Sequence, residues 1–230
     1  MNSFKNILAL DTALGGCCAA LVAGERSSVR GEAMPRGQAE YLVPFSQQVM
    51  GECELSYDAL DAVLCTVGPG AFTGLRIGIS TARAFGLSLG IPVFGVTTLQ
   101  AISMKASQEG VGAHTVILET KRQDFYAQNF GKDGRAIDDA VALHVEELEE
   151  RVQSLNCLVG DGARRFVEMS GRSDWACLEG YDLPDMLLVS RMLQDKGAEC
   201  GVFLSEADPV YLRGADVSQP KVKPRQIEQV

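Results

Sequence analysis

The sequence has few histidines, few basic residues and no long apolar run, and each shortage excludes a class of protein. Only two histidines are present, His114 and His144, and they lie too far apart in the chain to form an HxxxH-type metal-ligand pair. The metallopeptidase pattern HExxH is absent, and no cysteine–histidine pair stands out as a nucleophile with its base. We therefore expect no metal centre, and we nominate no catalytic residue.

Basic residues are outnumbered in this chain. It has 21 Lys and Arg against 30 Asp and Glu, which gives a formal net charge of −9 at pH 7. A protein that binds a nucleic acid by itself needs a basic surface, because each contact neutralises a phosphate. The one concentrated basic segment is Lys221-Val222-Lys223-Pro224-Arg225. We therefore expect this chain not to bind a nucleic acid by itself.

The chain also lacks the features of a membrane or secreted protein. No stretch of about 20 apolar residues is present, and the N-terminal segment leads directly into an apolar strand pattern, so we expect neither a membrane span nor a secretory signal. The seven cysteines form no CxxC pair, and several lie in apolar runs where a free thiol packs as a small hydrophobic group. These features favour a cytoplasmic protein of one large domain or two small ones.

A glycine segment, Gly68-Pro69-Gly70-Ala71-Phe72-Thr73-Gly74, lies between an apolar strand pattern at 62–67 and a helix pattern that continues to residue 89. A strand, a glycine turn and a helix in this order can hold a phosphate, because free N–H groups and the positive helix end point to one place. The spacing GxGxxxG fits neither the Walker A loop nor the dinucleotide fingerprint. Two interpretations stay open: a phosphate loop in which Gly68, Gly70, Thr73 and Gly74 bind the ligand, or a tight strand-to-helix turn.

An apolar strand pattern at 7–10 ends in Asp11-Thr12-Ala13, and a Gly15-Gly16 turn and a second strand pattern at 17–23 follow. This order predicts a β-hairpin with the Asp11 carboxylate near its tip. A carboxylate in that position can cap the turn by accepting a backbone hydrogen bond.

Four motifs carry a resemblance to the bacterial TsaB family, also known as YeaZ. They are LALDTA at Leu8–Ala13, GPGAFTGLRIG at Gly68–Gly78, GIPVFGVTTL at Gly90–Leu99 and ADPVYLR at Ala207–Arg213. The resemblance is strong over residues 1–105, patchy from there to 200 and clear again in the last motif. It implies an α/β protein with the ribonuclease-H-like fold of actin, Hsp70 and sugar kinases. Two subdomains are expected: residues 1–108 with the glycine segment, and a smaller, degenerate one of residues 109–230.

The same resemblance implies a function. A TsaB-like protein is expected to be a non-catalytic subunit that binds TsaD and supports transfer of a threonylcarbamoyl group to adenosine in tRNA. TsaE is the expected further partner, the chain alone is expected to form a homodimer, and tRNA is expected to be bound only through the complex. No cofactor is required, and weak binding of ATP or ADP at Asp11 and the glycine segment is the one cofactor interaction that the fold suggests.

The sequence departs from these relatives at several chemical positions. TsaD carries a metal-binding HxxxH helix after the strand that corresponds to residues 91–96, and here those two positions are Thr98 and Ile102. Glu119 and Gln38 stand where the family usually has aspartate and histidine. The TsaD metal site is therefore expected to be absent, and we assign no role to Glu119 or Gln38.

Two enzyme alternatives remain beside the subunit interpretation. A stand-alone ATPase or kinase-like protein of the same fold is favoured by the glycine segment and Asp11, but Thr66-Val67-Gly68 supplies no second carboxylate for magnesium. A peptidase-like protein is less favoured because the residues named above are missing. The segment Gly160-Asp161-Gly162 resembles nucleotide-facing turns of this superfamily, although an ordinary turn explains it more simply.

Two helix patterns are candidates for a partner surface. Apolar residues repeat at helical spacing in the first and small residues recur every four positions in the second: Tyr41, Leu42, Phe45 and Val49, and Gly78, Ala82 and Gly86. An interior glycine costs a helix about 0.5–1 kcal/mol relative to alanine, so the small residues require a close approach that offsets this cost. Either this ridge packs inside the chain, or, as the resemblance implies, both helices pack against a second subunit or TsaD.

Overall fold

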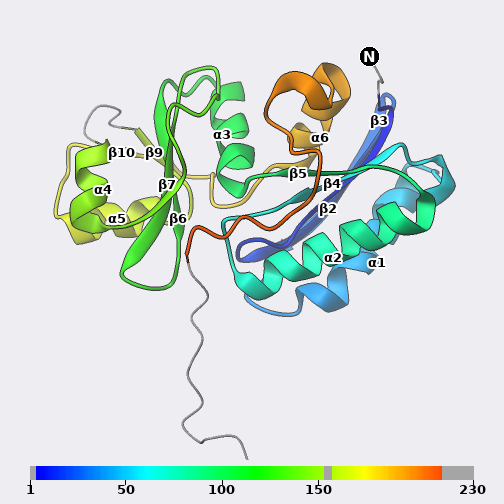
Figure 1. The fold of residues 1–230 in the computed structure, drawn as a ribbon, viewed down its shortest axis with the longest axis horizontal. Helices are drawn as coiled ribbons and strands as arrows, with labels where there is room; N and C mark the ends of the chain where they lie inside the picture. The colour runs from blue at the N-terminus through cyan, green and yellow to red at the C-terminus, as the bar shows by residue number, and fades with distance from the viewer. Residues whose placement is uncertain (1–3, 153–156, 214–230) are drawn as a thin grey trace, which may run out of the picture.

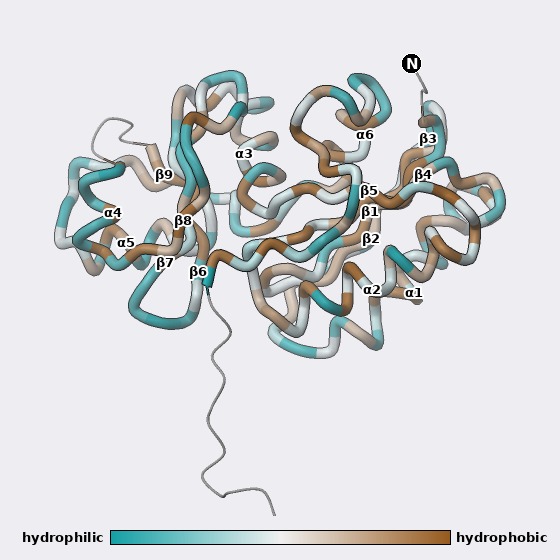
Figure 2. The backbone as a smooth tube through the Cα atoms, in the orientation of Figure 1, coloured by the Kyte–Doolittle hydropathy of each residue, from teal (hydrophilic) through white to brown (hydrophobic). Residues whose placement is uncertain are grey.

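The computed structural model describes residues 4–152 and 157–213, so the basic segment 221–225 lies outside the described residues. Within these ranges the strands form two five-stranded sheets, which lie side by side with helices around them (Figure 1). Hydrophobic residues concentrate on the central strands, and hydrophilic ones on the outer loops (Figure 2). None of the helices in the described ranges has the length and apolar character needed to cross a bilayer.

The first sheet has the strand order β3-β2-β1-β4-β5, antiparallel across β1, β2 and β3 and parallel from β1 through β4 to β5. Its strands are β1 Asn6–Asp11, β2 Gly16–Ala23, β3 Arg26–Ala33, β4 Ala62–Thr66 and β5 Val93–Val96. Helices α1 Gln38–Glu52 and α2 Phe72–Leu89 cover one face, and α6 Met186–Lys196 covers the other. This hairpin followed by parallel crossovers is the expected ribonuclease-H-like half of the actin-like fold.

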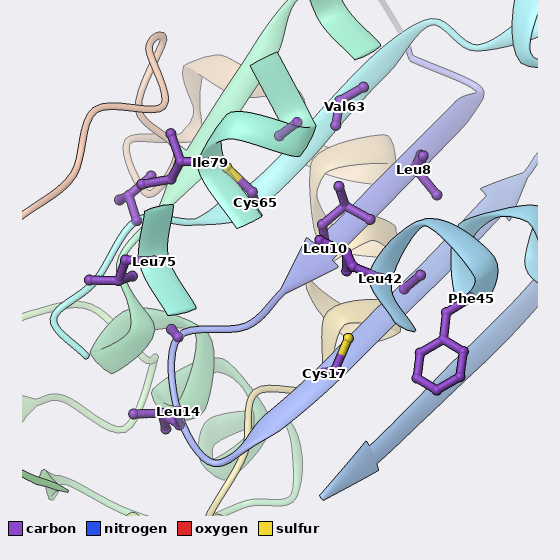
Figure 3. Close-up of a cluster of buried hydrophobic side chains, with 14 of the residues drawn as sticks. Leu8, Leu10, Leu14, Cys17, Leu42, Phe45, Val63, Cys65, Leu75 and Ile79 are labelled. Atoms are coloured by element: carbon purple, nitrogen blue, oxygen red, sulfur yellow. The ribbon is translucent and has the colours of Figure 1, made fainter. Parts of the chain in front are cut away.

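The residues of β1 explain why both faces of this sheet are covered. Leu8 and Leu10 belong to the core under α1 and α2, whereas Ile7 and Ala9 belong to the core under α6. All four side chains are fully buried, so the strand is a continuous apolar run, as a sheet buried on both faces requires. Figure 3 shows the first of these cores, in which Leu42 of α1 joins the strand side chains.

The second sheet has the order β10-β9-β6-β7-β8. Its strands are β6 His114–Glu119, β7 Asp124–Phe130, β8 Val141–His144, β9 Cys157–Val159 and β10 Ala176–Cys177. Helices α4 Val145–Val152 and α5 Ala163–Ser170 pack on one face, around Phe125 and Phe166, and α3 Thr98–Gln108 packs between this sheet and α6. Two short 3₁₀ helices, η1 Tyr57–Ala59 and η2 Ala198–Cys200, complete the described elements.

After β10 the chain returns to the first sheet. Helix α6 packs against β1 and β2, and Leu204 forms an isolated antiparallel bridge with Gly95 of β5. Helix α6 and residues 204–210 therefore pack with the first sheet, although the sequence analysis placed them in the second subdomain, 109–230. The boundary between residues 108 and 109 stays a prediction.

Strand β3 was not predicted from the sequence. It pairs with β2 alone at the edge of the sheet, and almost all of its residues are exposed. An exposed edge strand lacks the alternation of apolar and polar residues that identifies a half-buried strand. Its charged residues, Arg26, Arg30 and Glu32, suit an edge that must not pair with another chain.

The small-residue ridge of α2 packs inside this chain. Gly78, Ala82 and Gly86 are buried. A Cβ added at Gly78 would lie 2.7 Å from Oγ1 of Thr12, and one added at Gly86 would collide with the side chain of Val93 in β5. The expectation that these three residues contact a second subunit is therefore wrong, because the close approach that offsets the glycines is made to the same chain.

The same correction applies to most of the residues expected on the contact face of α1. Leu42, Phe45 and Val49 are buried in the core between α1 and the sheet. Tyr41 alone among the four is exposed, at 45%. Helical periodicity thus identified the inner side of α1, because an apolar repeat has the same form whether it is covered by the chain's own sheet or by a partner.

Candidate functional site

A cavity of about 590 Å³ opens where loops from both sheets meet. Its walls are the β1–β2 turn, the segment that enters α1, the start of α2, the β6–β7 loop and the turn after β9. The lining residues are Ala13–Gly15, Pro35–Glu40, Gly70, Ala71, Thr73, Gly74, Ile77, Glu119–Lys121 and Asp161. Loops that follow parallel strands are the usual position of a ligand site in open α/β sheets, so this cavity is the candidate site.

Only some of the residues that were predicted to bind a nucleotide lie at the cavity. Gly70, Thr73 and Gly74 line the cavity, whereas Gly68 and Asp11 do not. Binding of a nucleotide by the first three stays a prediction.

Asp11 lies behind the cavity, with only 2% of its surface exposed. Its Oδ1 accepts hydrogen bonds from the Thr66 hydroxyl at 2.5 Å and from the Ala13 N–H at 3.1 Å. Burial raises the pKa of Asp11, and these two hydrogen bonds partly oppose the shift because they stabilise the charged form. The burial contradicts the expectation that Asp11 faces a bound nucleotide. The geometry supports the alternative, in which Asp11 caps the hairpin turn.

Gly70, just before α2, and Gly74, in its first turn, are explained by close packing. A Cβ at Gly70 would collide with the carbonyl oxygen of Ala13, and one at Gly74 would collide with that of Thr12. The Ala71 N–H donates to the Ala13 carbonyl and the Thr12 hydroxyl donates to the Gly74 carbonyl, both at 2.7 Å. The start of α2 is therefore held directly against the hairpin turn. A tight strand-to-helix turn is enough to explain these glycines.

Asp161 is a half-buried carboxylate of the opposite wall. Its Oδ1 accepts a hydrogen bond from the Glu119 N–H at 2.9 Å, and burial raises its pKa to about 6. Glu119 in turn forms an ion pair with Arg165 of α5. A Cβ at Gly162 would lie 2.8 Å from the carbonyl carbon of Leu118, so the turn presses against the end of β6.

Two parts of the lining were not chosen as site residues: Asp161, whose turn the sequence analysis compared with nucleotide-facing turns but interpreted as an ordinary turn, and the segment Pro35–Glu40. A usable signal for the first was present, since two glycines that flank one carboxylate directly after a short apolar strand indicate close packing. No comparable signal marks Pro35–Glu40, which reaches the cavity only because β3 turns the chain back toward α2.

The lining residues carry mixed charge and include neither histidine nor cysteine. Arg36 and Lys121 face the same space as Glu40, Glu119 and Asp161. In residues 4–152 and 157–213, no group of three or more His, Cys, Asp or Glu side chains is placed to hold a metal ion. The start of α2 borders the cavity without a side-chain cap, and such a helix end favours an anion. The arrangement is suited to binding a polar or phosphorylated ligand.

The peptidase alternative finds no support in the geometry. The letters GxSxG occur at Gly86–Gly90, but Ser88 lies exposed in the last turn of α2 and not on a strand-to-helix turn. His114 is fully buried: Nδ1 lies 2.8 Å from the Gly112 carbonyl and Nε2 lies 3.0 Å from the Ser103 hydroxyl. Burial lowers the pKa of His114, so it is a neutral core residue with both ring nitrogens engaged.

Comparison with known proteins places this chain in a family. The family model described as TsaD, tRNA N6-adenosine threonylcarbamoyltransferase, matches residues 30–164, more than half of the chain. The tRNA threonylcarbamoyladenosine biosynthesis protein TsaB of Buchnera aphidicola subsp. Schizaphis graminum is 33% identical over 168 residues, which cover 70% of this chain and 80% of that protein. The chain belongs to the TsaB branch of this family.

Similarity to TsaB proteins extends over most of the chain. The protein of the same name from Escherichia coli K12 is 29% identical over 220 residues, which cover 90% of this chain and 94% of that protein. Among solved structures, YeaZ from Pseudomonas aeruginosa is similar with a TM-score of 0.76 and 26% identity, covering 90% of this chain and 100% of that one. The resemblance to TsaB that the four sequence motifs indicated is confirmed.

The last of those TsaB motifs, residues 207–213, runs over the start of the glycine segment. The Val210 N–H donates to the Val67 carbonyl at 2.7 Å. The Val210 carbonyl oxygen lies 2.7 Å from the place that a Cβ of Gly68 would occupy. Gly68 therefore makes room for this segment, which we call the strap, and not for a ligand.

The strap also joins the two sheets of the TsaB fold. The Tyr211 ring lies 5.6 Å from the Phe72 ring at the start of α2. Two residues later, Arg213 pairs with Asp124 of β7 at 3.1 Å. Both walls of the cavity are thus fixed to one short segment of chain.

Proposed function

We propose that this protein is a non-catalytic subunit in tRNA threonylcarbamoyladenosine biosynthesis that binds TsaD and supports its transfer of the threonylcarbamoyl group to adenosine in tRNA. The observation that carries the proposal is the similarity to proteins named TsaB over 90% of the chain. A cavity lined by mixed charges, without a nucleophile and its base, agrees with a subunit that binds and positions.

The proposed TsaD-binding surface is the outer side of α1 and α2. Phe72 is 50% exposed, and the Arg76 guanidinium lies 3.8 Å from the centre of its ring. Phe72 and Arg76 line an open groove of about 520 Å³, to which α1 contributes Ala39. Tyr41 of α1 is also exposed. Aromatic residues and arginine are enriched at the centres of protein interfaces, and exposed apolar patches mark such sites. In the absence of TsaD, the same surface would pair two copies of the chain as a homodimer.

Contact with tRNA is proposed to occur only through the complex. The formal net charge of −9 opposes binding to a polyanion by this chain alone. TsaD, with TsaE as the further partner, would supply the surface that holds tRNA. The isolated protein should therefore not retard tRNA in a gel at physiological salt, whereas its mixture with TsaD should.

Reconstitution with TsaD tests the proposed function. We expect the purified protein to raise the rate at which TsaD modifies tRNA, measured as threonylcarbamoyladenosine formed per unit time. Phe72→Ala with Arg76→Ala should reduce that stimulation about tenfold or more, because anchor residues at an interface carry most of its binding free energy. Ile137→Ala, which removes an exposed apolar side chain from the region between β7 and β8, is the matched control and should retain full stimulation. Stimulation that the double substitution leaves intact would contradict the proposed surface.

Weak nucleotide binding is the second candidate function, and one feature favours it. The uncapped start of α2 faces a 590 Å³ cavity, a volume in the usual range for small-ligand pockets. Calorimetric titration of the isolated protein with ATP and magnesium would detect such binding. Turnover of ATP by the isolated protein would support the stand-alone ATPase or kinase-like alternative and contradict the non-catalytic proposal.

A further inference from the structure

The strap, residues 207–213, passes from the edge of the first sheet at β5 to the second sheet (Figure 1). Two glycines of the first half leave room for its backbone. A Cβ at Gly68 would lie 2.7 Å from the Val210 carbonyl oxygen. One at Gly95 in β5 would lie 3.2 Å from the carbonyl oxygen of Glu206, just before the strap. The docked position of the strap is therefore built into the first sheet.

The strap is nevertheless held by few contacts for its length. Of its seven residues Ala207 alone is buried, and Tyr211 is 46% exposed. Within the described ranges, a single backbone–backbone hydrogen bond joins it to the rest of the chain, from the Val210 N–H to the Val67 carbonyl. A segment with few buried contacts and few backbone hydrogen bonds opens at a lower free energy than the whole protein. Release of the strap alone is therefore less costly than unfolding.

Two side chains of the strap reach opposite walls of the cavity of about 590 Å³. The Tyr211 ring lies 5.6 Å from the ring of Phe72, the first residue of α2, and the first turn of α2 lines the cavity. Arg213 pairs with Asp124 at 3.1 Å. Asp124 Oδ1 in turn accepts the hydroxyl of Thr120, a lining residue of the other wall, at 2.8 Å. The strap thus contacts one wall directly and the other through one intervening side chain.

We propose that the strap is a latch that docks and releases as one unit, and that its docked state holds the two walls of this cavity together. Tyr211 and Arg213 are only two positions apart, so contact with one wall keeps the second side chain close to the other. A tethered second contact forms at a high effective concentration, and the coupling is reciprocal, so loss of either contact weakens both. Release frees both walls, and docking fixes them again. The strap therefore controls how firmly the cavity encloses its contents.

Amide hydrogen exchange of the full-length ¹⁵N-labelled protein, followed by nuclear magnetic resonance at constant pH, tests this proposal. Three hydrogen-bonded amides report on the latch: Val210 in the strap, Ala71 at the wall formed by α2, and Glu119 at the opposite wall. We expect Tyr211→Ala and Arg213→Ala each to raise all three exchange rates about three- to tenfold. The decisive effects are those across the cavity, of Tyr211→Ala at Glu119 and of Arg213→Ala at Ala71, because the deleted contact lies on the other wall.

Low concentrations of urea separate release of the strap from unfolding of the protein. Exchange through release exposes little surface, so the three rates should hardly change with urea. The amide of Ala9 in the central strand β1 exchanges through global unfolding and should respond strongly. This comparison remains valid in a variant of lower overall stability.

Two variants are the matched controls. Tyr211→Phe keeps the ring that packs on Phe72 and should leave the three exchange rates unchanged. Arg26→Ala removes an exposed ion pair of β3, outside the strap, and should also leave them unchanged. The proposal is overturned if each alanine substitution acts only at the wall that its side chain reaches, or at neither wall. It is also overturned if the three rates depend on urea as Ala9 does, since the strap would then open only with the whole protein.

Discussion

At the scale of single residues, burial separates two carboxylates with different roles. Asp11 is closed off by the hairpin and serves the turn, whereas Asp161 lies at the wall of the cavity and is fixed by the Glu119 N–H. Burial raises the pKa of both groups, so each costs folding free energy when charged. The cost at Asp161 is measurable because its pKa, about 6, lies within the range in which the protein can be studied.

We expect Asp161→Asn to stabilise the protein at pH 7 and to remove part of its pH dependence. The pKa of Asp161 is raised from 3.8 to about 6 in the folded state, so the native state binds this proton more tightly than the unfolded chain. Stabilisation from this group is therefore complete below about pH 4 and is lost as the pH rises through about 6. Asparagine keeps an acceptor for the Glu119 N–H without the charge. The gain at pH 7 should be on the order of 1–3 kcal/mol.

Urea denaturation of the wild type and the variant between pH 4 and pH 8 measures this difference. Asp195→Asn, at an exposed position of α6, is the matched control and should leave the pH profile unchanged. Two parallel profiles for wild type and Asp161→Asn would contradict the assignment.

At the scale of elements, α2 has an inner side fixed by glycines and an outer side available to a partner. Gly86 faces β5, while Phe72 and Arg76 point outward from the first two turns. The existence of α2 was predictable from the strand, glycine and helix order. Its orientation was not, because a ridge of small residues indicates close approach without identifying the partner. Edge strand β3 was missed for a related reason: it has no buried side and therefore no periodic pattern.

Alanine at two helical glycines should have opposite effects on stability. Gly86→Ala places a Cβ against Val93 and within 3.1 Å of the Ile91 carbonyl, so we expect a loss of about 1–3 kcal/mol from overpacking. Gly51→Ala in α1 adds a Cβ with nothing within 4 Å, so the gain in helix propensity, about 0.5–1 kcal/mol, should appear as stabilisation. Thermal and urea unfolding of both variants, monitored by circular dichroism, compare the two. A folded, unchanged Gly86→Ala protein would return the ridge to the candidate subunit contacts.

At the scale of the whole molecule, the cavity depends on segments far apart in the sequence. Gly70 and Asp161 reach it from different sheets, so no local pattern predicts that they meet. The motif at 207–213 was predictable as a TsaB feature, but its structural role was not. That role is to tie Val67 in the first half to Asp124 in the second.

The ion pair at the end of the strap should contribute more to stability than the other ion pair of the same segment. Asp124 is 8% exposed and Arg213 31%, so Arg213→Ala leaves a nearly buried carboxylate. Among the described residues it then keeps the Thr120 hydroxyl, 2.8 Å away, as its one side-chain donor. We expect a loss of about 1–3 kcal/mol, below the roughly 3–5 kcal/mol of a fully buried pair because Arg213 is partly solvated. Arg83 and Asp208 also pair, but both are more than half exposed, so Arg83→Ala should cost at most about 1 kcal/mol.

Urea unfolding of the two variants makes the comparison. Adding Asp124→Asn to Arg213→Ala should recover part of the loss in stability, because it removes the unpaired charge. Equal losses for the two arginines, or no recovery in the double variant, would show that the strap is held by its backbone and aromatic contacts and not by the Arg213–Asp124 pair.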